Sequence, residues 1–198
     1  METKFKMFFF FLFLLLLSAC NMMHAQEKYQ DLSTLFSYNQ EQLYGFIGDN
    51  YQRLILHYDT IYKESDQNKY HAEGYVIYRK DKIRWKAVIQ PEKTTRNSHN
   101  SYVLLSKFTM VLSDSSHIEG CFTTLYRKEG NTIVYDDSGF TSDSYMNNYF
   151  VGKWKYKGDI QKCCWGEFRI PESGDLDIGA GEFSPNEKYY SYGWDDFE

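Results

Sequence analysis

From residue 51 onward the chain alternates apolar and polar positions with a period of two, and no other feature limits its fold as strongly. Leu54, Leu56 and Tyr58 fall on one side of this alternation, opposite Arg53 and His57, which predicts a strand with one buried face. The alternation returns over residues 74–78 and 83–89. Because only the short stretch 79–82 separates these two strands, they must pair as antiparallel neighbours.

Five further segments carry the same signature or a continuous apolar run: Tyr102–Leu112, His117–Lys128, Thr132–Tyr135, Phe150–Tyr156 and Gln161–Ile170. About eight strands with hardly any helical periodicity predict an all-β domain over residues 51–198, folded as a single antiparallel barrel or sandwich. The barrel is favoured by four glycines within strands, because closure requires bends. These glycines are Gly74, Gly120, Gly152 and Gly166.

Residues 20–50 lack this alternation. Their apolar positions are scattered, and Gly45 and Gly48 interrupt any longer pattern. We therefore expect a tether followed by a short helix or an irregular segment that covers the β-domain.

The first 20 residues have the organisation of a secretion signal. Lys4 and Lys6 precede an apolar run that ends at Leu17 and that is shorter than the roughly 20 residues needed to span a bilayer. The run leads into Leu17-Ser18-Ala19-Cys20, which resembles the bacterial lipobox. The resemblance implies that residues 1–19 are a signal peptide, that Cys20 carries the lipid, and that the protein is anchored in the bacterial cell envelope, at the outer membrane.

A second cleavage site competes with this interpretation. Ala25, in Met23-His24-Ala25-Gln26, is a small residue of the kind that an ordinary signal peptidase accepts. Cleavage there would give a secreted or periplasmic protein without a lipid.

The net charge excludes one class of function. The chain carries −5 at neutral pH, and loss of a signal peptide that contains Lys4, Lys6 and Glu2 lowers this to about −6. A nucleic-acid binder needs a basic surface to neutralise phosphates. We therefore expect no nucleic-acid partner.

Three cysteines remain after Cys20 is assigned to lipid: Cys121, Cys163 and Cys164. In an oxidising compartment, Cys121 could form a disulfide with either of the other two, which would leave one thiol free. The alternative is three unbonded thiols that act as small hydrophobic residues.

The acidic segment before the C-terminus is the one candidate for chemistry. Asp175, Asp177 and Glu182 lie close together in the sequence and could supply oxygen ligands for calcium, although the segment does not complete an EF-hand loop. Glu167 with Asp175 or Glu182 could alternatively form the carboxylate pair of a hydrolase acting on envelope glycan. A solvated acidic edge is the third interpretation, and we expect no cofactor.

Two further groups are candidates for binding. Lys153, Lys155 and Lys157 share one face of a predicted strand; they indicate either a solvated or edge strand protected against aggregation or contact with an acidic partner, anionic lipid or glycan. Trp194 belongs to an aromatic group near the C-terminus that could form an exposed contact or close the end of the barrel.

Together these features predict an envelope lipoprotein that is a non-enzymatic binding module for a protein or an apolar ligand. An interior cavity would favour the apolar ligand. A filled core with an exposed patch would favour a protein partner, including an inhibitor or immunity role. The carboxylate-based hydrolase is the alternative.

Overall fold

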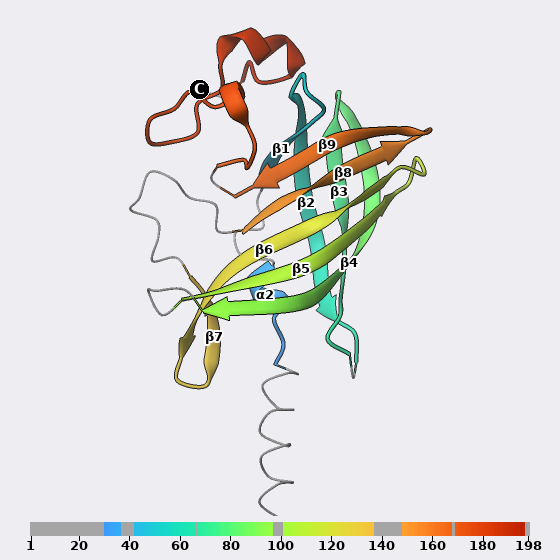
Figure 1. Cartoon of the computed structure of the whole chain (residues 1–198). Helices are drawn as coiled ribbons and strands as arrows, with labels where there is room; N and C mark the ends of the chain where they lie inside the picture. Colours follow the sequence, from blue (N-terminus) through green and yellow to red (C-terminus); the bar gives the residue numbers. More distant parts are fainter. Residues whose placement is uncertain are drawn as a thin grey trace, which may run out of the picture.

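The computed structural model describes residues 30–36, 42–65, 67–96, 101–136, 148–167 and 169–196. Nine strands and one short helix form most of this part of the chain (Figure 1). The elements are α2 (Ser33–Phe36), β1 (Leu43–Ile47), β2 (Gln52–Lys63), β3 (Tyr70–Tyr78), β4 (Asp81–Arg96), β5 (Ser101–Leu112), β6 (His117–Glu129), β7 (Thr132–Tyr135), β8 (Asn148–Tyr156) and β9 (Asp159–Gly166).

Eight of the strands close into an antiparallel barrel, so the predicted all-β class is confirmed and the barrel is preferred over the sandwich. Each strand from β1 to β6 pairs with the next, β6 pairs with β8, β8 with β9, and β9 returns to β1. The remaining strand, β7, pairs with the far part of β6, beyond the part that β8 occupies, and has no other strand partner among the described residues. The pairing of β1 with both β2 and β9 removes the open edges that an unclosed sheet would present to another chain.

The strand β1 lies in the segment for which the sequence predicted a helix or an irregular cover. Gly45 looked like a break, but it is the residue that lets β1 approach β9. A Cβ at Gly45 would lie 2.4 Å from the carbonyl oxygen of Cys164 and 2.6 Å from the Cβ of Trp165. The predicted short helix is present as α2.

The last strand is shorter than predicted. β9 ends at Gly166, whereas the sequence pattern extended to Ile170. Ile170 is buried outside the barrel instead, in a second apolar cluster. An apolar residue after the strand was therefore mistaken for a continuation of it.

Large side chains fill the interior of the barrel. Phe108, Phe122, Phe150 and Trp165 are all fully buried, and the rings of Phe150 and Trp165 stack with their centroids 3.8 Å apart. They belong to one large cluster of buried residues inside the barrel, which also includes Leu35, Phe36, Leu43, Ile47 and Trp154 and which we call the inner core. Two glycines make room for it, because a Cβ at Gly152 would lie 2.3 Å from the ring of Phe150, and the paired Gly120 would be similarly crowded.

The helix α2 closes one end of the barrel (Figure 1). Its residues Leu35 and Phe36 are buried in the inner core, and the ring of Phe36 meets that of Tyr70 edge to face at 5.0 Å. The side chain of Asn148, at the start of β8, donates a hydrogen bond to the carbonyl oxygen of Leu35.

The segment after β9 packs on the outside of the barrel, above β1 and β9 (Figure 1). It contains two 3-10 helices, Gly174–Leu176 and Glu187–Tyr192. Its apolar residues meet outward-facing residues of the strands in a separate cluster, which we call the outer core. The outer core consists of Phe46, Cys164, Ile170, Leu176 and Trp194.

Substitution of buried polar residues tests how the barrel is stabilised. Thr124 is fully buried, and its hydroxyl has no hydrogen-bond partner among the described residues. Removing such a group by Thr124→Val is expected to raise the free energy of unfolding by about 1 kcal/mol. The matched Ser116→Ala should lower it by about 1.5 kcal/mol, because the buried Ser116 hydroxyl donates to Asp114 at 2.6 Å. Urea denaturation measures both; a loss of stability in Thr124→Val would contradict the first expectation.

Candidate functional site

Four lysines from three strands lie on the outer wall of the barrel, and we call this group the lysine face. It consists of Lys107 on β5, Lys153 and Lys155 on β8, and Lys162 on β9. Strand alternation turns Lys153 and Lys155 outward because Trp154 between them faces the inner core. The register places Lys153 directly beside Lys162 and across from Glu119 of β6.

One carboxylate lies among these lysines. Glu119 accepts a hydrogen bond from Lys155, and this bond lowers the pKa of Glu119. Lys107 and Lys153 lower the pKa further through their charges. Lys162 approaches another carboxylate, Glu172, at 3.7 Å. Three lysines therefore surround one glutamate, and the centre of the face has a positive charge.

The structure changes the predicted row of three lysines in two ways. Lys157 lies in the turn between β8 and β9, with a φ of 49°, and its Nζ sits 4.9 Å from the centroid of the Tyr156 ring. In addition, β8 is paired on both sides, so the edge-strand interpretation is wrong. The lysines are not needed to protect an open edge.

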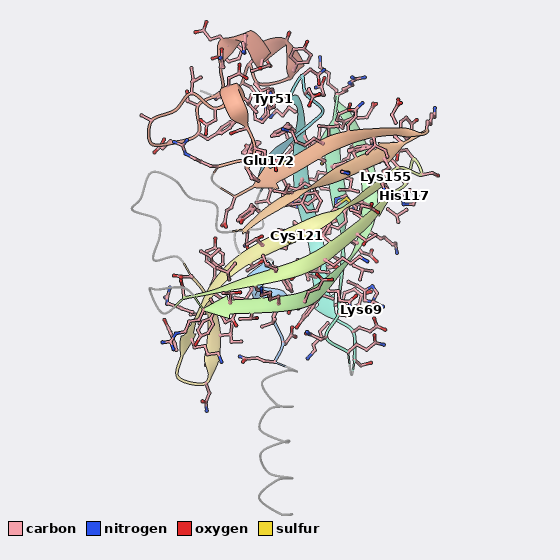
Figure 2. All side chains as sticks on the ribbon, in the orientation of Figure 1. Tyr51, Lys69, His117, Cys121, Lys155 and Glu172 are labelled. Carbon is pink, nitrogen blue, oxygen red and sulfur yellow. The ribbon has the colours of Figure 1, made fainter. Side chains whose placement is uncertain are left out.

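Three residues of this site were not predicted from the sequence, and they come from neighbouring strands: Lys107, Glu119 and Lys162. Figure 2 shows Lys155 and His117 together at one end of this wall, with Cys121 farther along β6. No spacing in the sequence links these residues. The register between strands, which brings them together, depends on how the barrel closes.

The predicted disulfide does not form: all three thiols are unbonded, but only Cys163 and Cys164 are buried as the alternative expected. Cys121 is exposed on β6, and the whole of β8 separates it from Cys163 and Cys164 on β9. Two strand spacings, about 9.6 Å, exceed the reach of a disulfide. Burial raises the pKa of the Cys164 thiol to about 12, and the charge of Glu172 raises it further. Burial also raises the pKa of Cys163 well above its ordinary value, with a second contribution from Cys164.

Trp194 is fully buried in the outer core, so it cannot form the exposed contact that the sequence suggested. Its indole N–H donates to the carbonyl oxygen of Tyr51 at 2.8 Å. Arg53 of β2 lies beside it, with its guanidinium 5.0 Å from the Tyr44 ring and 5.4 Å from the Trp194 ring. Arg53 also donates to the carbonyl oxygen of Gly193 and to Asp196, and so attaches the C-terminal segment to β2.

The acidic candidates each have separate partners. Asp175 is exposed and binds Lys188 and the hydroxyl of Tyr189, and these contacts lower its pKa. Asp177 forms an ion pair with Arg169 at 2.9 Å. Glu182 is exposed, and Glu167 accepts a hydrogen bond from Tyr135. These contacts do not join the carboxylates into the pair that a hydrolase would need.

The same contacts argue against the predicted calcium site. The second carboxylate oxygen of Asp177 accepts hydrogen bonds from the backbone N–H groups of Gly179 and Ser184. Asp177 therefore stabilises the loop that follows it. Within the described ranges, no three histidine, cysteine or acidic side chains are grouped as metal ligands would be.

Comparison of the chain with protein-family models, with curated proteins and with solved structures finds no match. The predicted signal peptide, Cys20 and the alternative cleavage site at Ala25 lie outside the described residues. Across the residues that are described, none of the helices has the length and apolar character to cross a membrane.

Arg53 provides a test of how the C-terminal segment is held. Arg53→Met keeps most of the side-chain volume but removes the bonds to Gly193 and Asp196, so it is expected to cost about 1.5–3 kcal/mol. Hydrogen exchange should become faster in residues 186–196 and stay unchanged in the barrel strands. The control is Arg84→Met, which removes an exposed pair with Asp59 and should cost no more than about 1 kcal/mol. Equal effects of the two substitutions would contradict the role given to Arg53.

Proposed function

We propose that this chain is a lipid-anchored protein of the bacterial envelope that binds an acidic protein through the lysine face. The observation that carries the proposal is the group of Lys107, Lys153 and Lys155 around Glu119 on the outer wall. A binding module, rather than an enzyme, best fits an arrangement in which the acidic candidates have separate structural partners.

The filled interior supports a partner outside the barrel. An apolar ligand within a barrel needs a cavity, whereas here the inward-facing rings of Phe108, Phe150 and Trp165 pack against one another. The packed centre of the barrel therefore favours recognition of a protein partner on the outer wall. The same surface would serve an inhibitor or immunity protein.

The charge distribution supports an acidic partner. The chain as a whole carries −5, yet the lysine face concentrates positive charge on one part of the wall. Such an asymmetry attracts and orients an acidic partner and repels a basic one.

The position of the face favours a protein over the anchoring membrane. The N-terminal segment joins the barrel at α2, beside Asn148 at the start of β8. Lys155 lies near the other end of β8, about 23 Å away for a strand of this length. Lys153 and Lys155 therefore lie toward the end of the barrel opposite α2, and Lys107, which is level with Val151 through Cys121, lies nearer the middle.

Charge reversal tests the proposed partner. An octaglutamate peptide should bind the purified chain, and Lys107→Glu with Lys153→Glu and Lys162→Glu should weaken that binding by about tenfold or more. The matched control, Lys82→Glu with Lys86→Glu and Lys93→Glu, makes the same change in net charge on exposed residues of β4 and should leave binding nearly unchanged. Calorimetric titration at two salt concentrations measures both.

Three results would contradict this proposal. The first is no binding of the acidic peptide, and the second is equal weakening by the two triple variants. The third is binding of the wild-type chain to vesicles with anionic lipid but not to the peptide, which would assign the face to a membrane.

The lipid anchor has its own test. Mass spectrometry of the chain purified from the membrane fraction should give an N-terminal peptide that begins at Cys20 and carries the mass of the attached lipid. Cys20→Ser should move the protein out of the membrane fraction, because the thiol is the attachment point. An unmodified N-terminus at Gln26 would contradict the anchor and support cleavage after Ala25.

A further inference from the structure

The end of the barrel opposite α2 is an open cavity of about 250 Å³. Its floor consists of inward-facing apolar and aromatic residues from four strands: Ile47, Tyr78, Ile83 and Trp154. The rings of Tyr78 and Trp154 are 5.1 Å apart, and Tyr156 stands above them with 38% of its surface exposed. We call this cavity the barrel mouth.

Acidic residues form the rim of the barrel mouth. Asp81 lies in phase with the inward-facing Ile83 and Trp85 of β4, and Asp159 lies in phase with Cys163 of β9. Both positions follow the pattern of buried residues, yet both carry a carboxylate and are exposed. The inward-facing pattern therefore changes from apolar to acidic at this end of the barrel.

The carboxylates outnumber the cations that line the mouth. Asp81, Asp114 and Asp159 line it together with the cation Arg79, and a second cation, Lys157, lies beside the ring of Tyr156. Asp114 accepts hydrogen bonds from the backbone and hydroxyl of Ser116. Asp81 and Asp159 form no ion pair with any described residue.

The rings at the mouth already associate with cations. The guanidinium of Arg79 lies 5.3 Å from the centroid of Tyr78, and the ammonium of Lys157 lies 4.9 Å from that of Tyr156. Both cations come from hairpin turns at this end, where Arg79 and Lys157 have positive φ values. Aromatic faces and carboxylates together attract a positive group more strongly than either does alone.

We propose that the barrel mouth binds the end of an aliphatic ammonium chain. The apolar stem contacts Ile47, Ile83 and Trp154, and the ammonium lies between Asp81 and Asp159, near the ring of Tyr156. A cavity of 250 Å³ suits a group the size of a lysine side chain. Mouths of β-barrels are a common position for such sites, and a few polar groups above an apolar floor set their orientation.

Two sources share this chemistry, namely a free diamine and a lysine side chain of another protein. The site is independent of the proposed function, because it uses carboxylates at the mouth and none of the lysines on the wall. If acidic peptides failed to bind the lysine face, the proposed site at the barrel mouth would be unaffected.

Calorimetric titration of the purified chain with 1,4-diaminobutane and with Nα-acetyl-lysine amide tests the proposal. At least one should bind with a millimolar or lower Kd, and the tighter ligand identifies the source. Asp81→Asn with Asp159→Asn should weaken binding by at least about tenfold, and Tyr156→Leu by about fivefold. The control Asp59→Asn with Glu73→Gln, two acidic residues of the outer wall, should have no effect.

Neutral ligands provide the opposing outcome. 1-Pentanol has a comparable stem without the charge, and glucose tests a sugar that would stack on the rings. The proposal is overturned if either neutral ligand binds as tightly as the amines. It is also overturned if neither amine binds at about 10 millimolar, the concentration range of a weak fragment. A control variant that loses as much affinity as the double Asp variant would overturn it as well. Circular dichroism of each variant confirms that the barrel is folded.

Discussion

The barrel depends on the pairing of one short strand with two neighbours. β1 has five residues, yet it bonds to β2 on one side and to β9 on the other. Without it, β2 and β9 would present two open edges. Its inward residues, Leu43 and Ile47, complete the inner core, and its outward Phe46 begins the outer core. Both hydrophobic clusters therefore share this strand.

Closure also makes the two ends of the barrel different. At one end α2 inserts Leu35 and Phe36 into the inner core. At the other end the inward-facing positions become acidic and the cavity stays open. The C-terminal segment covers part of the wall and is attached through Arg53. The two surfaces that we propose for recognition are the mouth and the part of the wall that carries the lysine face.

Much of this fold could be predicted from local patterns, but the sites could not. Alternation located the strands from β2 to β9. The turn predicted at residues 79–82 indicated the β3–β4 hairpin, which in the structure turns at Arg79 and Lys80. The alternation pattern gave the wrong result at Gly45, because a glycine signals either a break or a close approach. It also gave the wrong result at Ile170, because this apolar residue belongs to the outer core. Lys153 and Lys155 were found because they lie on one strand, whereas Lys107, Glu119 and Lys162 were not.

The sequence by itself determined the all-β class, the antiparallel hairpins and the outward direction of the lysines, because each depends on neighbours a few residues apart. It also indicates a signal peptide with a lipobox at Cys20. Only the tertiary structure decided that the sheet closes as a barrel, that Cys121 cannot reach Cys163 or Cys164, and that Trp194 is buried. These features depend on register and packing between segments far apart in the chain, and no local pattern encodes which strands become neighbours.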